Sequence, residues 1–152
     1  MRKILSIIFI ILPMNGCQKV QTFEVVGTWV MKEESRKLLP SDIENSLVKI
    51  TVLGDGTFIA YELPRIGYFY SGKYVDKWRV ISGSGTWKFL DISGSQNLHL
   101  WFHEFSFENE EKKNVSEGFP LVISKVWSTI DMYYDLSDPD QFMRVEFEKI
   151  LH

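Results

Sequence analysis

Residues 48–63 read VKITVLGDGTFIAYEL, and this stretch decides the fold class. Val48, Ile50 and Val52 alternate with polar residues, which is the period-two pattern of a half-buried β-strand. The sequence Gly-Asp-Gly at 54–56 signals a turn, and residues 57–63 then resume β-type sequence. We therefore expect a β-hairpin whose second strand ends at Pro64.

The same kind of sequence continues on both sides of this hairpin. Upstream, alternation at 25–31 predicts a first strand, and the charged segment 33–45 is the one plausible helical zone, with Ser41 and Asp42 as caps for a short helix after Pro40. Residues 66–82 are rich in tyrosine and in turn formers, and the acidic segment 108–117 predicts a solvated loop. The further predicted strands are 83–89, 98–103, 119–126, 128–135 and 142–150.

About eight short strands joined by tight turns indicate an all-β, antiparallel meander. A meander must protect its edge strands, and closure into a barrel removes those edges altogether. We therefore expect a barrel with one short helical zone after the first strand. An open sandwich is the competing architecture.

Composition limits the classes of function. The chain has 152 residues, 17 Lys+Arg against 20 Asp+Glu, and a net charge of −3. This length fits one globular domain, or one domain plus a short appendage. A slightly acidic chain lacks the clustered cations that non-specific nucleic-acid binding requires, so we expect no nucleic-acid partner.

The N-terminus has the three-part organisation of a secretory signal peptide. Arg2 and Lys3 are followed by the nine-residue apolar run 4–12, which Pro13 ends. Nine residues are too few to cross a bilayer as a helix, which takes about 20. The segment therefore predicts export and not a membrane-spanning helix.

The end of this segment, Met14-Asn15-Gly16-Cys17, resembles the lipobox of bacterial lipoproteins. Gly16 and Cys17 match that pattern, whereas Met14 and Asn15 replace the commoner Leu and Ala or Ser. The resemblance implies cleavage before Cys17, a lipid on its sulfur, and attachment of the mature chain to a membrane. It divides the chain into a signal peptide (1–16), a lipidated tether (17–22) and a barrel domain (23–152).

The cysteine count agrees with this interpretation. Cys17 is the single cysteine of a chain that we expect to be exported, where thiols normally pair, and acylation accounts for it without a partner. Gln18 after the cysteine favours the outer membrane by the family's sorting rule, if the cell has one. Loss of Arg2 and Lys3 with the signal peptide leaves 15 bases against 20 acids, a net charge of −5.

The predicted domain also resembles the lipocalins. Gly27-Thr28-Trp29 is similar to their Gly-x-Trp signature, in which the Trp closes the base of the barrel. A similar arrangement in bacterial lipocalin-like domains includes an Asp-Gly-Thr-Phe hairpin, here 55–58, and a second Gly-x-Trp, here Gly85-Thr86-Trp87. The resemblance implies a barrel that binds a small apolar ligand, and the helical zone after the first strand departs from it.

The chain offers few patterns typical of catalysis or metal binding. His99 and His103 are four residues apart, and on one strand face that spacing places them about 13 Å from one another at ~3.3 Å per residue. They cannot share a metal ion at that distance without a third element. The run Ser82-Gly83-Ser84-Gly85 lacks the first Gly of a nucleophile elbow. We therefore expect no enzyme, no catalytic residue, no metal and no cofactor.

The excess of aromatic residues suggests candidate binding surfaces. Tyr68, Tyr70, Tyr74 and Trp78 crowd one turn-rich segment, and Trp101 lies between His99 and His103. Tyrosine and tryptophan dominate recognition hot spots, although such rings also pack on their own sheet with the polar atoms in water. Both interpretations stay open for these residues.

Three hypotheses for function follow from the sequence. The first is a membrane-anchored lipoprotein of the cell envelope that binds a small apolar ligand in the barrel without catalysis. The second is a protein-binding envelope module, such as an immunity factor or an inhibitor of a periplasmic enzyme or toxin, whose acidic surface attracts a basic partner. The third, an enzyme, is disfavoured because no catalytic constellation is evident.

Overall fold

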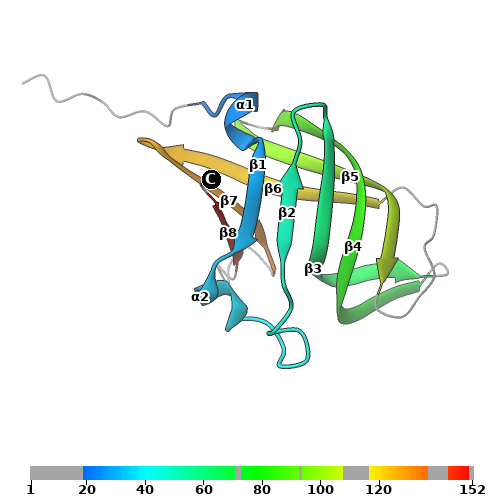
Figure 1. Ribbon diagram of the computed structural model, residues 1–152. Coiled ribbons are helices and arrows are strands. Elements are labelled where there is room, and N and C mark those ends of the chain that lie inside the picture. Colours follow the sequence, from blue (N-terminus) through cyan, green and yellow to red (C-terminus); the bar gives the residue numbers. More distant parts are fainter. Residues whose placement is uncertain (1–18, 71–72, 93, 108–116, 137–143, 151–152) are drawn as a thin grey trace, which may run out of the picture.

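The computed structural model describes residues 19–70, 73–92, 94–107, 117–136 and 144–150, and this part of the chain forms an antiparallel closed barrel (Figure 1). The predicted barrel is confirmed. Its strands are β1 Gly27–Met31, β2 Lys49–Val52, β3 Thr57–Tyr70, β4 Lys73–Ile92, β5 Ser95–Phe107, β6 Glu117–Val126, β7 Thr129–Asp135 and β8 Arg144–Lys149. The two short helices are α1 Thr22–Val25 and α2 Glu33–Arg36. Neither helix in the described ranges has the length and apolarity to cross a membrane.

Each strand pairs with its neighbour in sequence, and β1 pairs with β8 to close the barrel. Because successive strands run in opposite directions, the β2–β3, β4–β5 and β6–β7 turns share one end of the barrel with α1 and with the end of β8 (Figure 1). We call this the α1 end. The segment that follows β1 and the β3–β4 connection lie toward the opposite end.

The period-two patterns of the sequence fill the barrel interior. Leu98, Leu100 and Phe102 of β5 are fully buried, as are Val145 and Phe147 of β8, so the predicted alternation in both strands is confirmed. Aromatic rings meet across the interior. The ring-centroid distances are 4.9 Å for Phe58–Phe102, 5.0 Å for Phe119–Tyr134 and 6.2 Å for Tyr134–Phe147.

The two Gly-Thr-Trp motifs have similar physical roles. Each tryptophan is buried and donates its indole N–H to a main-chain carbonyl at the α1 end: Trp29 to Val25 at 2.8 Å and Trp87 to Leu53 at 2.9 Å. Gly85 is required by close strand packing, because a Cβ there would overlap the carbonyl oxygen of Trp101 on β5. Both motifs therefore stabilise the α1 end of the barrel, whereas the resemblance to lipocalins implied a closing role for the first tryptophan alone.

Pro64 does not end its strand, which corrects the prediction. β3 continues from Thr57 to Tyr70, and Pro64 pairs with Val80 of β4. The described β2–β3 pairing stops at Tyr61, so Pro64 lies where β3 has lost its neighbour on one side and a missing N–H costs no ladder bond there. Just before it, Glu62 has φ +50° at a bulge in the β3–β4 register.

The other differences concern the extent of the elements. α1 lies where the first β-like run was expected to begin, and within the predicted helical zone only α2 is helical, whereas 41–45 form turns. Most of the tyrosine-rich segment 66–82 belongs to the long strands β3 and β4. The signal peptide, Cys17 and most of the predicted loop 108–117 lie outside the described residues.

Candidate functional site

The outward-facing residues of β5 gather the aromatic groups that the sequence singled out. His99 and Trp101 alternate with the buried leucines of that strand and point away from the interior. Their rings contact each other, with centroids 5.2 Å apart and planes inclined by 44°. The pair forms a partly exposed aromatic surface on the outer wall of the barrel.

His103 extends this surface at a β-bulge. In the register of β4 and β5, Ser84 pairs with Glu104 and Gly85 with Phe102, so His103 is the additional residue on β5. Its Nε2 lies 3.0 Å from Oγ1 of Thr86, and the side chain is exposed. The two histidines therefore have different neighbours, and no group of His, Cys, Asp or Glu among the described residues is arranged to hold a metal ion.

The residues beside His99 and Trp101 on the two neighbouring strands carry little charge. Thr86 and Lys88 of β4 lie opposite Trp101 and His99, and Gly118 and Pro120 of β6 lie opposite the same two residues on the other side. Gly118 has no side chain, and a Cβ there would meet no atom within 4 Å, so space beside Trp101 remains open. We call this set the outer aromatic face: Thr86, Lys88, His99, Trp101, His103, Gly118 and Pro120.

The other predicted aromatic candidates lie elsewhere. Trp78 on β4 is partly buried and packs against the hydrophobic core. The backbones of Tyr68 and Tyr70 belong to β3 and that of Tyr74 to β4, near the end of the β3–β4 hairpin. The structure describes only the backbone of these three residues. The structure thus brings together His99, Trp101 and His103, and it places Trp78 in a packing role.

A pocket of about 330 Å³ lies where β6 and β7 separate. These strands pair from Val122 and Tyr133 to their turn, and in the described part the preceding half of β6 pairs with β5 alone. The pocket is lined by Arg65, Asn97, Gly118, Phe119, Pro120, Val122, Tyr134, Asp135 and Leu136. Gly118 and Pro120 make it continuous with the outer aromatic face.

Tyr134 is a buried residue of the lining of this pocket. Its hydroxyl donates to the main-chain oxygen of Pro64 at 2.6 Å, linking β7 to β3 across the barrel. Burial raises the pKa of Tyr134 well above its ordinary value, so the hydroxyl keeps its proton and this donor role at physiological pH. A buried, hydrogen-bonded aromatic ring therefore forms part of the pocket wall.

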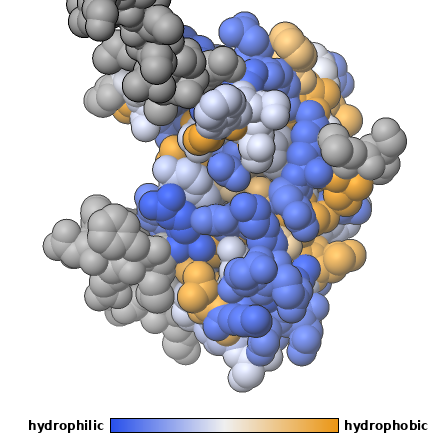
Figure 2. Space-filling model, turned by 90° about the vertical axis from the view of Figure 1, so that its left-hand side faces the viewer, coloured by the Kyte–Doolittle hydropathy of each residue, from blue (hydrophilic) through white to orange (hydrophobic). Residues whose placement is uncertain are grey.

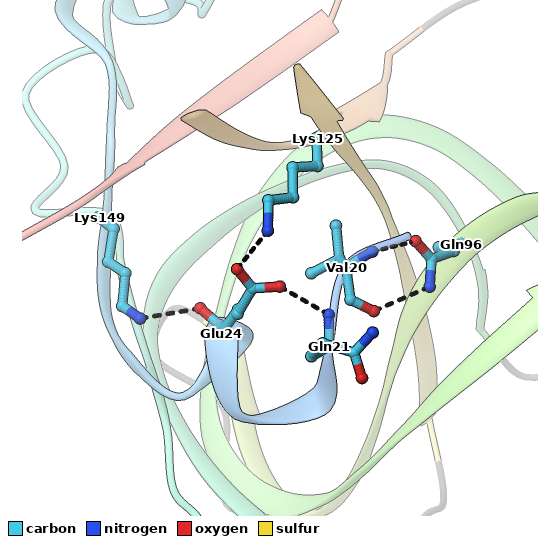
Figure 3. A network of polar contacts seen from close by, with 6 residues as sticks. All are labelled: Val20, Gln21, Glu24, Gln96, Lys125 and Lys149. Carbon is cyan, nitrogen blue, oxygen red and sulfur yellow. Dashed lines mark hydrogen bonds and ion pairs between the residues drawn. The ribbon is translucent and has the colours of Figure 1, made fainter. Parts of the chain in front are cut away.

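The α1 end is closed by a polar network around Glu24 (Figure 3). One carboxylate oxygen accepts from the main-chain N–H of Gln21 at 2.8 Å, and the other accepts from Nζ of Lys125 on β6 at 2.6 Å. Lys149 on β8 donates to the main-chain oxygen of Glu24 at 2.8 Å. These bonds hold α1 over the buried ring of Trp29, which Lys149 Nζ approaches to 5.8 Å from the ring centroid.

The chain is fixed at this end from Val20 onward. Gln96 on β5 accepts from the main-chain N–H of Val20 at 2.7 Å and donates to its carbonyl at 3.0 Å (Figure 3). The Val20 side chain is only 3% exposed, so part of the predicted tether is docked on the barrel. Sequence reasoning missed this network because glutamine is not a preferred N-cap residue, and no local pattern links residues 20–24 to Gln96, Lys125 and Lys149.

The Glu24 network predicts a pH dependence of stability. Hydrogen bonds from the Gln21 N–H and from Lys125 lower the pKa of Glu24 below its usual 4.5. A lowered pKa in the folded state adds stability that is fully present above about pH 4.5 and is lost as the pH falls through the folded value. We expect Glu24→Gln to lower the melting temperature at pH 6 and to differ less from the unmodified protein at pH 3. An equal difference at both pH values would contradict the assigned role.

Comparisons with protein-family models, with curated proteins and with solved structures returned no match for this chain.

Proposed function

We propose that this chain is a lipid-anchored, non-catalytic binding protein of the bacterial cell envelope whose partner is a protein that contacts the outer aromatic face. One observation carries the proposal. The described interior of the barrel is filled by its own side chains, with Trp29, Phe58 and Phe102 at most 1% exposed, whereas the His99–Trp101 pair faces outward. Such packing favours recognition on the wall over a ligand in the centre, since small barrels are often filled by side chains.

The anchor rests on the sequence of the N-terminus. The cationic start, the short apolar run and Gly16-Cys17 support export and acylation of the single cysteine. Gln18 favours the outer membrane where one exists. The acyl chains then hold the barrel at a membrane surface, because each buried methylene contributes about 0.8 kcal/mol.

The outer aromatic face supports a protein partner by its chemistry. Tryptophan is enriched among interface hot spots, and a ring held by packing loses little conformational entropy on binding. The ring of Trp101 contacts that of His99, and Lys88 is the one lysine or arginine in the set. The net charge of −5 of the mature chain would speed the approach of a basic partner. An inhibitor or immunity factor for a periplasmic enzyme or toxin fits this description.

A second candidate function is supported by the pocket between β6 and β7. Its volume of about 330 Å³ and its lining by Phe119, Tyr134 and Leu136 suit a small, largely apolar molecule. In this alternative the ligand sits in the barrel wall and not in the packed centre.

Site-specific photocrosslinking in cells that make the protein tests the main proposal. A photoreactive residue in place of His103 or Lys88, both exposed on the outer aromatic face, is expected to yield the same crosslinked protein partner. Glu148, exposed on β8, is the matched control and is expected to yield no such product.

Equal products from all three positions, or none, would contradict a partner at this face. Native mass spectrometry of the purified protein tests the second candidate on the same preparation. A stoichiometric apolar adduct beyond the covalent lipid, together with no crosslink from His103 or Lys88, would favour the wall pocket over the protein partner.

A further inference from the structure

Exposed apolar side chains gather at the α1 end of the barrel. In the described part of the chain, the large ones at this end are Phe23, Leu53, Ile92, Val126, Trp127 and Ile150. Phe23 is 74% and Trp127 70% exposed, the largest values among the described hydrophobic residues. The remaining exposed large hydrophobic residues are scattered over the outer wall and the opposite end.

Phe23 and the β6–β7 turn lie close together. Phe23 and Ser128 line the same groove, and the neighbouring pair Glu24 and Lys125 is joined at 2.6 Å. The β6–β7 hairpin projects from this end of the barrel (Figure 1). Trp127 lies in its turn, between Val126 and Thr129, with φ +60°, and its side chain is exposed. A side view of the molecule is mostly hydrophilic, with smaller hydrophobic patches that include one at the upper end (Figure 2).

The N-terminal segment connects this end to the proposed lipid. Val20 is docked by its two bonds to Gln96, and Cys17 precedes it by three residues. Three residues span at most about 11 Å when fully extended. An acylated Cys17 therefore keeps Val20, which is docked at the α1 end, within that distance of the membrane interface.

We propose that the α1 end lies directly on the lipid bilayer, with Phe23 and Trp127 inserted into the headgroup region. This inference rests on the proposed lipid attachment at Cys17. Tryptophan and phenylalanine favour the membrane–water interface, where the apolar ring is buried and the indole N–H stays hydrated. Lys19 is paired with Asp91 at 3.2 Å, Lys125 is paired with Glu24, and Lys149 donates to the main-chain oxygen of Glu24. The contact is therefore driven by apolar burial and does not need anionic lipid.

Such a contact determines the orientation of the barrel relative to the membrane. The acyl chains supply attachment, and the inserted rings supply orientation, with the barrel standing on its α1 end. The outer aromatic face on β5 is part of the barrel wall, so it remains directed to the side where a soluble protein can reach it.

Fluorescence quenching by brominated lipid tests this proposal. The protein purified from membranes is reconstituted into phosphatidylcholine vesicles in which bromine is carried near the headgroup end of one acyl chain. Quenching of tryptophan emission is expected in the unmodified protein, and Trp127→Phe is expected to lose most of it. Trp101→Phe, on the outer wall, is the matched control and is expected to keep it. Phe23→Ser is expected to weaken the quenching of Trp127.

The outcomes separate this inference from the proposed function. Protein that does not float with the vesicles would contradict the lipid anchor itself. Protein that floats, but shows equal quenching in the unmodified and Trp127→Phe forms or none in either, would overturn the membrane contact while leaving the anchor intact. Circular dichroism is used to check that the variants remain folded, and we expect Trp127→Phe to fold normally because the side chain of Trp127 is exposed.

Discussion

Replacing Trp29 by alanine is expected to lower the free energy of unfolding by about 3–5 kcal/mol, the usual cost of removing a buried Phe or Trp side chain. Trp29 is fully buried beneath α1, and its Nε1 donates to the carbonyl of Val25 at 2.8 Å in a buried site. The substitution leaves a cavity and an acceptor without its donor. Urea denaturation followed by circular dichroism measures the change.

Trp127→Ala is the matched control for this substitution. Its side chain is 70% exposed, so we expect a change within about 0.5 kcal/mol. If Trp29→Ala were no more destabilising than Trp127→Ala, the role of Trp29 in closing the barrel would be wrong.

Replacing Cys17 by serine is expected to move the protein from the membrane fraction to the soluble fraction of the envelope. The change removes the sulfur that the proposed acyl chains occupy, and the exposed rings of Phe23 and Trp127 alone hold a protein only weakly at a surface. Ultracentrifugation followed by immunodetection measures the distribution.

An uncleaved signal peptide would complicate this measurement, because its apolar run could itself remain in the membrane. The serine variant is therefore also made with residues 1–16 replaced by the signal peptide of an ordinary secreted protein, which is cleaved after an Ala-x-Ala site. If this second form still sediments with membranes, the anchor does not depend on Cys17.

The barrel could be predicted because its signals are local. Alternation at Val48, Ile50 and Val52, and again at Leu98, Leu100 and Phe102, follows directly from the two faces of a strand, one of them buried. The turn after Val52 likewise lies where Gly-Asp-Gly predicts it, with Asp55 Oδ1 accepting from the Thr57 N–H at 2.9 Å.

The differences arise where distant residues override a local preference. Pro64 is accepted within β3 because β2 has already ended beside it. α1 is only four residues long, too short to be stable alone, and Lys125 and Lys149 hold it from strands about a hundred residues away in sequence. No pattern within residues 19–25 reports those partners.

The candidate site was predictable in part. Alternation alone places His99 and Trp101 on the face opposite the buried leucines, and the structure confirms that they share the outer wall. The bulge that carries His103 depends on the close approach of Gly85 to Trp101, which sequence spacing does not reveal. Trp78 lies in the long strand β4 and not in a turn, and its side chain packs against the hydrophobic core.

Lipid attachment at Cys17 is tested by the mass of the mature protein extracted from membranes, with sequencing of its N-terminal peptide. We expect a chain that begins at Cys17 and carries a diacylglyceryl group on the cysteine sulfur. A chain that retains Met1 and an unmodified cysteine would contradict it.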